Sequence, residues 1–391
     1  MLNPVPTLDH ASQTEVEELL VRLVATPSIN PWITPGASGE GEVAAFISDW
    51  LRALDGVEVV VDEVLPGRPN VIARVPGTSG NGHLAFNVHT DTVDCAAWPD
   101  RALEPARDGD RLIGLGVSDN KAQCAALMSL VKRLAADPPA VDVTAVWAID
   151  EEGPSAGTRH LVESFSADAC VVLEPFGIGR ACVMHQGFGS LDLVVRAQAA
   201  HGIADDSPDA IVQLADLVKG LAEIDRELAA NPHPEVGKAF FHTAWVRGGT
   251  DYGTYPAEVT LGFEFGTNPG EALADRLRSI DAVIEQTRAA HPTLDAEVVV
   301  RLENQPFVAE GHEALLDAFS GATEEVTGAP AEAQSKNTWT DAAIMQAAGI
   351  PTIVAGATGG NQHAVDEWVS LDSLGQLVVV LERTSRRFSA R

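Results

Sequence analysis

The amino-acid sequence predicts an α/β fold into which a second, ferredoxin-like α+β domain is inserted. The chain has 391 residues, more than a single hydrophobic core usually organises. Strand-like and helical segments alternate through its first half, as in a sheet covered by helices. From about residue 187 the order becomes β-α-β-β-α-β, which is the ferredoxin-like order. We therefore expect a first domain at residues 1–185 and 305–391, with an insertion at residues 186–304.

Apolar residues at helical spacing and short apolar runs define the elements of the first half. The expected helices cover residues 12–25, 40–54, 121–135 and 157–163. The expected strands cover residues 57–64, 70–75, 84–89, 111–113, 141–149 and 169–173. Acidic residues recur where these strands end, and open α/β sheets hold their ligands at such strand ends.

The inserted segment combines four strands with two long helices. Its expected strands cover residues 191–197, 240–247, 257–265 and 296–302, and its helices residues 208–230 and 270–290. After about residue 305 the α/β pattern resumes, with a strand at 350–354 and helices at 312–327, 340–348 and 371–387. The insertion is therefore internal to the first domain.

Charge and composition exclude several functions. The formal net charge is −30 and hydrophobic residues make up 45% of the chain. Such a charge repels nucleic acid and anionic membranes, so we expect neither as a partner. The sequence has no apolar run of 18 residues, so we expect no transmembrane helix. The N-terminus lacks the features of a signal peptide. We expect a cytoplasmic protein.

The cysteines do not form a recognisable motif. Without C-x-x-C spacing, a disulfide framework or a cysteine zinc site is disfavoured, and we expect small core residues. The four cysteines are Cys95, Cys124, Cys170 and Cys182.

Histidines and carboxylates gather at the predicted strand ends. His89 and Asp91 lie two residues apart, so both can point to one side of a strand. Asp119 follows a Gly-rich turn that lacks the spacing of a phosphate loop. Taken singly, such residues also fit a solvated strand end or a helix N-cap. The full set is His89, Asp91, Asp119, Glu151, Glu152, Glu174 and His363.

This set suits a pair of divalent ions. Imidazole and carboxylate ligands favour Zn²⁺, Co²⁺ or Mn²⁺. One carboxylate can bridge two ions, so five residues suffice as ligands. A further carboxylate can then accept a proton from a water molecule.

Five segments together resemble the motifs of the M20 metallopeptidases, over essentially the whole chain. They are His89-Thr90-Asp91, Gly116-Val117-Ser118-Asp119-Asn120-Lys121, Asp150-Glu151-Glu152, Glu174-Pro175 and His363-Ala364-Val365-Asp366-Glu367. The resemblance implies a mixed-sheet, zinc-peptidase-like catalytic domain, with the insertion as a lid and dimerisation domain. Glu at position 174 is more typical of carboxypeptidase and deacylase members than of aminopeptidases.

The resemblance also implies roles for the metal ligands. His89 and Glu174 would bind one ion, Glu152 and His363 the other, and Asp119 would bridge them. The peptide bond after Asp119 would be cis.

Three further residues would act in the reaction. Asp91 would orient His89, and Glu151 would be the general base for a metal-bridging water. His201 would reach the partner's active site in a homodimer and stabilise an oxyanion; the other interpretation is a turn or capping residue.

Two positions depart from the pattern of many relatives. Gly253 and Gly266 stand where an Asn and an Arg would bind a substrate α-carboxylate, so that clamp is missing. Either another cation, Arg247 or Lys336, replaces it, or the substrate presents a neutral or cationic group. Asn337 is a further candidate substrate contact.

The leading hypothesis is therefore a hydrolase with two divalent ions, zinc favoured, that cleaves an amide in a small molecule. The substrate would be an N-acyl amino acid or a small dipeptide or carboxypeptidase-type substrate. One alternative is a catalytically silent relative that binds a small molecule, which the intact Glu151 disfavours. Another is an acidic structural protein, which five ordered motifs disfavour.

Overall fold

The computed structural model describes residues 7–80, 82–94, 96–98, 101–204 and 207–389; the expectation for Cys95 lies outside them. The chain forms two compact units. Unit 1 comprises Met1–Val183, Ala309–Gln334 and Thr340–Arg391, and unit 2 comprises Met184–Val308 and Ser335–Trp339. Residues 335–339, which the sequence placed in the first domain, thus group with unit 2. The chain passes between the units along β8 (Arg180–His185) and β16 (Glu332–Lys336), which pair with each other.

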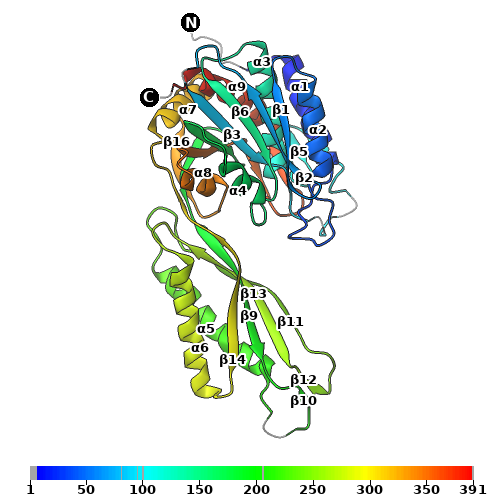
Figure 1. Ribbon diagram of the computed structural model, residues 1–391, viewed down its shortest axis with the longest axis vertical. Coiled ribbons are helices and arrows are strands. Elements are labelled where there is room, and N and C mark those ends of the chain that lie inside the picture. Colours follow the sequence, from blue (N-terminus) through cyan, green and yellow to red (C-terminus); the bar gives the residue numbers. More distant parts are fainter. Residues whose placement is uncertain (1–6, 81, 95, 99–100, 205–206, 390–391) are drawn as a thin grey trace. The chain divides into compact units, whose positions relative to one another are not determined.

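Unit 1 is built on a mixed sheet, as expected (Figure 1). The strand order is β1-β2-β6-β3-β7-β17-β8-β15. The central strands β6, β3, β7 and β17 are parallel, whereas β1, β2 and β8 run antiparallel to their neighbours. Their bounds are β1 Glu58–Leu65, β2 Arg68–Val75, β3 His83–His89, β6 Asp142–Ala148, β7 Ala169–Leu173, β15 Phe307–Val308 and β17 Thr352–Ala355.

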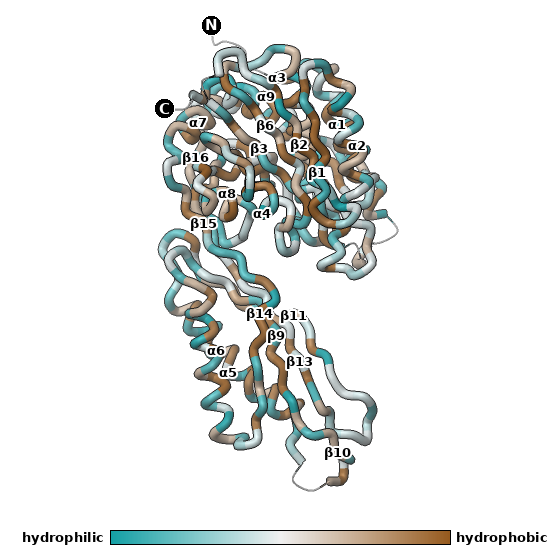
Figure 2. Tube along the Cα trace, viewed as in Figure 1, coloured by the Kyte–Doolittle hydropathy of each residue, from teal (hydrophilic) through white to brown (hydrophobic). Residues whose placement is uncertain are grey.

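Helices cover both faces of this sheet. On β3, Phe86 and Val88 share one core with α1, α2, α3, α7 and α9, whereas Asn87 points the other way and donates to Thr158 on α4. Alternation along the strand therefore puts α4 on the opposite face, where it contacts α8. The helix bounds are α1 His10–Ala25, α2 Gly41–Arg52, α3 Ala122–Ala136, α4 Ala156–Val162, α7 Glu313–Thr327, α8 Ala342–Ala347 and α9 Leu371–Arg387. Figure 2 shows apolar colouring along the strands and hydrophilic colouring in most turns.

Local signals fix where several helices start and stop. The Asp9 side chain accepts a hydrogen bond from Ser12 N at the start of α1, and Ser370 accepts from Ser373 N at the start of α9. Gly328 ends α7 with a left-handed backbone. A kinked turn, Val117–Lys121, with non-helical backbone at Asp119 and Asn120, precedes α3, so this helix begins one residue later than the sequence suggested.

In a small second sheet, strands from two segments of unit 1 that are distant in sequence pair with each other. Its order is β18-β19-β5-β4. The strands are β4 Ala106–Asp108, β5 Arg111–Ile113, β18 Gly359–Gly360 and β19 Trp368–Ser370. The sequence indicated only β5, because strands of two or three residues leave no readable alternation.

Unit 2 has the ferredoxin-like fold. Its main sheet has the order β11-β13-β9-β14 and is antiparallel throughout. Leu191, Leu217 and Phe263 belong to its separate apolar core. The bounds are β9 Gly187–Arg196, α5 Ala210–Ala230, β11 Phe241–Gly248, β13 Glu258–Thr267, α6 Leu273–Ala290 and β14 Asp295–Asn304. A short pair, β10 (Ala200–His201) with β12 (Thr254–Tyr255), completes it.

The described helices include none with the length and apolar character needed to cross a membrane.

Candidate metal centre

The carboxyl ends of four neighbouring parallel strands supply the candidate ligands. His89 is the last residue of β3, Glu151 and Glu152 follow β6, and Glu174 follows β7 directly. The chain after β17 leads to His363. Because β6, β3, β7 and β17 are adjacent in the sheet, residues far apart in sequence meet at one edge.

These side chains form two possible metal-ligand groups. His89, Asp119 and Glu174 make one group, and Asp119, Glu152 and His363 make the other. Within each group the ligand atoms lie within 4.8 Å of one another. Asp119 belongs to both, as a bridging carboxylate would.

The distances define the centre of this arrangement. His89 Nε2 lies 3.1 Å from Asp119 Oδ1 and 3.7 Å from Glu174 Oε1. His363 Nε2 lies 2.9 Å from Glu152 Oε1 and 3.5 Å from Asp119 Oδ2. The two oxygens of Asp119 thus face different histidines.

Asp91 lies behind His89 and contacts the main chain of the acidic turn. Asp91 Oδ1 is 3.3 Å from His89 Nδ1 and accepts a hydrogen bond from Glu151 N at 3.1 Å. Asp91 Oδ2 accepts from Glu152 N at 3.0 Å and from Asn30 Nδ2 at 2.7 Å. One buried carboxylate thus contacts His89 and the main chain of the next two site residues. The sequence offered no signal for Asn30.

A buried ion-pair cluster supports the same turn. The Arg68 guanidinium donates to both oxygens of Glu40 and to Asp150 Oδ1. Asp150, directly before Glu151, has a φ of 72°, a backbone conformation uncommon outside glycine. Glu40 and Arg68 were not predicted, because nothing in their local sequence links them to residue 150.

The peptide bond between Asp119 and Asn120 is cis, as the resemblance implied. Asn120 Nδ2 donates to Leu173 O, the residue before Glu174, at 2.6 Å. Gln123 Nε2 donates to Ser118 O and to Asn120 Oδ1, at 2.6 and 2.7 Å. Gln123 therefore holds this turn in place from within α3.

Burial and crowded charge shift the acid–base behaviour of the site. Burial, together with neighbouring carboxylates, raises the pKa values of Glu151 and Glu174 well above the usual range. For His89 burial opposes protonation, but Glu174, Asp119 and Asp91 outweigh it and raise the pKa well above its usual value. Burial also raises the pKa of Asp341, near the same carboxylates, to about 6.

The predicted substrate and lid residues all lie in unit 2, whereas the ligand groups lie in unit 1. His201 is exposed on β10, and its Nδ1 accepts from Ile203 N at 3.3 Å. The Arg247 guanidinium stacks on Trp245, 4.3 Å from the ring centroid. Lys336 ends β16, and Asn337 follows it, exposed.

The two glycines of the missing clamp occupy different surroundings. Gly266 is buried, and a Cβ there would lie 2.8 Å from Phe240 N, so this position leaves no room for an arginine. Gly253 is exposed and donates from its main-chain N to Asp251 Oδ1 at 2.7 Å.

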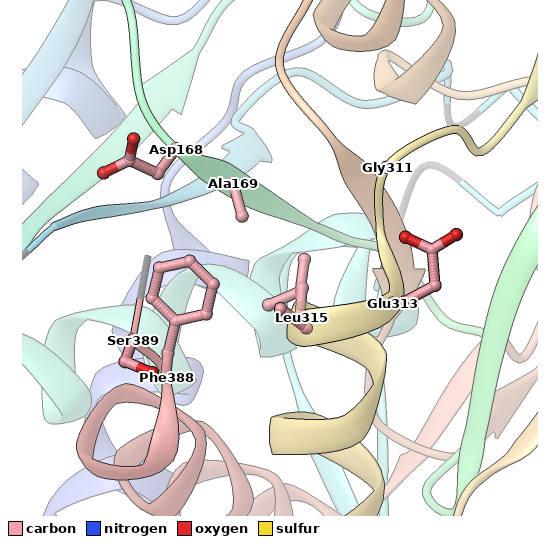
Figure 3. A pocket seen from close by; sticks show the side chains of 8 residues that line it. Asp168, Ala169, Gly311, Glu313, Leu315, Phe388 and Ser389 are labelled. Carbon is pink, nitrogen blue, oxygen red and sulfur yellow. The ribbon is translucent and has the colours of Figure 1, made fainter. Parts of the chain in front are cut away.

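A cavity at the other end of β7 is separate from the ligand groups (Figure 3). Asp168 and Ala169 lie at the amino end of β7, whereas Glu174 follows its carboxyl end. In Figure 3 the side chains of Phe388 and Leu315 face the same space beside the start of α7. Because its position is away from the ligands, we do not assign this cavity to the site.

Two ligand groups that share one carboxylate at the strand ends of a mixed α/β sheet suit a pair of metal ions and the hydrolytic chemistry such ions support. Residues 85–387 match the family model described as Peptidase family M20/M25/M40. The chain belongs to this family and is an enzyme of the M20 amidohydrolase and peptidase type.

Similar proteins agree in fold and length. The chain is 27% identical over 390 residues to an acetylornithine deacetylase of Vibrio campbellii, covering 95% of this chain and 98% of that protein. It is 27% identical over 336 residues to a succinyl-diaminopimelate desuccinylase of Aromatoleum aromaticum, covering 81% and 84%. The crystal structure of human carnosine dipeptidase 1 superposes with a TM-score of 0.78 at 15% identity, covering 97% of this chain and 100% of that one.

Proposed function

We propose that this enzyme hydrolyses the amide bond of a small N-acyl amino acid or dipeptide-type substrate, with two divalent ions and Glu151 as general base. The observation that carries the proposal is the pair of ligand groups that share Asp119, with Glu151 beside them. Glu151 Oε2 lies 3.9 Å from His89 Nε2 and belongs to neither group.

The residues present fit two metal ions. Both groups combine one imidazole with two carboxylates, a ligand set for Zn²⁺, Co²⁺ or Mn²⁺, and we favour zinc. Burying carboxylates this close together is costly without cations, as the raised pKa values of Glu151 and Glu174 indicate. When bound, such ions would polarise the amide carbonyl and lower the pKa of a water molecule.

We assign the ligands by group. His89 and Glu174 would hold one ion, Glu152 and His363 the other, and Asp119 both. Asp91 would keep the His89 ring in place through Nδ1, at 3.3 Å.

Glu151 would move the proton. Its carboxylate would accept a proton from the attacking water and later deliver it to the leaving nitrogen. Burial raises the pKa of Glu151 well above the usual range, which favours holding that proton between the two steps.

The substrate assignment rests on the relatives and on unit 2. A deacetylase and a desuccinylase are among the similar proteins, which supports an N-acyl amino acid. Without the usual clamp at Gly253 and Gly266, we propose that Arg247, Lys336 or Asn337 contacts the substrate, or that the substrate lacks a free α-carboxylate there.

Unit 2 would act as a lid and as a dimerisation domain. Its exposed apolar side chains, including Ile203, Val246 and Tyr252, would be covered in a homodimer. His201 would then stabilise the oxyanion in the partner's site. The net charge of −30 fits a small-molecule enzyme of the cytoplasm.

Replacing Glu151 with Gln tests the mechanism. We expect turnover to be lost, by a factor of about 10² or more, with metal content unchanged. The substrates would be N-acetyl and N-succinyl amino acids and dipeptides, assayed with Zn²⁺, Co²⁺ and Mn²⁺ separately. The exposed Glu313→Gln is the matched control, and full turnover in the Glu151 variant would contradict the proposal.

The same assay addresses the alternative of a silent binding protein. Saturable binding of a substrate by the wild-type protein, without turnover under any metal, would favour a binding function over catalysis.

A further inference from the structure

We propose that Glu367 is a positioning residue that fixes the bridging Asp119 and thereby sets the affinity of the metal centre. This inference rests on the proposed two-metal function. Glu367 ends the motif His363-Ala364-Val365-Asp366-Glu367, and the motif does not indicate that it contacts the turn of Asp119.

The Glu367 carboxylate binds the turn that carries Asp119 by three main-chain hydrogen bonds. Its Oε2 accepts from Gly116 N at 2.8 Å, and its Oε1 accepts from Ser118 N at 2.8 Å and from Asp119 N at 2.7 Å. Glu367 is 1% exposed. Three N–H donors thus converge on one buried carboxyl group, and both of its oxygens are engaged as acceptors.

This contact joins two of the three segments that supply ligands to the second group, those of Asp119 and His363. Asp119 is held at its main-chain nitrogen by Glu367 and faces His363 with its side chain, at 3.5 Å. The main chain adds a further link, because Gly114 N donates to Glu367 O at 3.1 Å. A displacement of the 116–119 turn would therefore change the spacing between Asp119 and His363.

The geometry argues against other roles for Glu367. Both of its carboxylate oxygens accept main-chain hydrogen bonds, and it belongs to neither ligand group. It touches the main chain of a ligand and not the position where a substrate would react. It therefore acts through Asp119.

Three variants distinguish a role of Glu367 in positioning Asp119 from a general contribution to the stability of the folded protein. In Glu367→Gln the side chain keeps its size, but its NH₂ group must face an N–H donor of the turn. Glu367→Asp keeps the carboxyl group and shortens its reach, so it should recover part of the function. Glu313→Gln makes the same chemical change as the first variant on an exposed residue of α7.

The first readout does not depend on catalysis. In the metal-free protein, hydrogen exchange of residues 114–121 should be at least about tenfold faster in Glu367→Gln, because the bonds that protect those amides are lost. Exchange in the core strands β3 and β6 should stay at the wild-type rate. Unchanged exchange at residues 114–121 would overturn the proposal.

The second readout is metal binding. Calorimetric titration with Zn²⁺ should show the dissociation constant of at least one site raised by about 10–100-fold in Glu367→Gln, the usual effect of removing an outer partner of a ligand. Glu367→Asp should lie between this variant and wild type, and Glu313→Gln should match wild type. Equal affinity in all variants would also overturn the proposal.

The two hypotheses can fail separately. If the wild-type protein binds no metal, the proposed function fails, while the exchange experiment still tests the contact with the turn. If Glu367→Gln does not fold, the exchange and affinity of Glu367→Asp decide the matter.

Discussion

Asp91 Oδ2 accepts a hydrogen bond from the main-chain nitrogen of Glu152 at 3.0 Å. The same carboxylate accepts from Glu151 N and lies against His89. The proposed base and two of the proposed ligands are therefore positioned by one side chain. The short segment after β3 and the acidic turn after β6 behave as one structural unit.

Replacing Asp91 with Asn should damage metal binding as well as turnover. An amide cannot accept at both positions, so one of the Glu151 and Glu152 N–H groups would face an NH₂ group. We expect a loss of about 10–100-fold in metal affinity or activity, measured by metal content and kcat. Asp108→Asn, an exposed change on β4, should leave both unchanged, and a wild-type result for Asp91→Asn would contradict the role of Asp91.

Metal binding should release protons. In the metal-free protein Glu152 and Asp119 raise the pKa of His363 to about 12, and the pKa of His89 also lies well above its usual value. A raised pKa favours the protonated ring in both cases, and each ring must be neutral at the nitrogen that ligates. Affinity should rise with pH, and calorimetry in buffers of different ionisation enthalpy should detect the released protons. Binding that does not depend on buffer would refute this.

Removing the metals should lower the melting temperature. An ion that binds only the folded state stabilises it by mass action, and its loss leaves the carboxylates of Glu152, Glu174 and Asp119 facing one another. Thermal unfolding with and without a chelator measures the difference. Addition of Zn²⁺ in excess should restore the original melting temperature, and equal melting temperatures in both conditions would argue against bound metal.

Gly157→Ala should destabilise the enzyme, although the same change in an exposed helix interior stabilises by about 1 kcal/mol. A Cβ at Gly157 would lie 2.5 Å from Ile149 N and 2.6 Å from Ile149 O. Backbone cannot move aside as a side chain can, so we expect a cost of about 1–3 kcal/mol. Urea unfolding measures it, and a gain in stability would show that α4 does not pack this closely on the end of β6.

Asp142 should contribute stability that depends on pH. The Gly77 N–H and the Arg74 guanidinium hold the pKa of Asp142 below its usual value. Because the pKa is lower in the folded state, this contribution is present above the unfolded value of 3.8 and is lost as the pH falls through the folded value. The difference in unfolding free energy between wild type and Asp142→Asn should therefore shrink as the pH is lowered below about 4. A difference that is constant with pH would contradict the linkage.

The parts of the fold that follow from local pattern were predictable. The helix-covered α/β sheet and the ferredoxin-like insertion depend on long apolar runs and helical spacing, which the sequence displays directly. That the sheet is mixed was implied by the resemblance to the M20 family. Residues that share a strand end, such as His89 and Glu174, could be grouped because parallel strands end at the same edge. The grouping of residues 335–339 with unit 2 could not be predicted, because β16, which leads into this segment, has little apolar character.

The supporting contacts were harder to predict. Asn30 and Arg68 reach the site from segments far away in sequence, and each looks like an ordinary polar residue in its own surroundings. Glu367 lies in the motif that begins at His363, but the motif does not indicate that its side chain contacts the 116–119 turn. Their partners are mostly main-chain atoms or buried charges, whose positions depend on the completed tertiary structure. The candidate ligands and the candidate base at the strand ends form recognisable sequence motifs. The contacts that position these residues are not visible in the sequence.

His363 and Glu152, whose side chains meet at 2.9 Å, are separated by 211 residues of chain. All of unit 2 lies between them in the chain, and Glu367, which binds the 116–119 turn, comes later still. During synthesis on the ribosome the first half of the chain can form β3, β6 and β7 but must wait for the C-terminal segment to close the second ligand group. A nascent or truncated chain that ends before residue 363 would therefore present the first candidate ligand group, His89, Asp119 and Glu174, without the second.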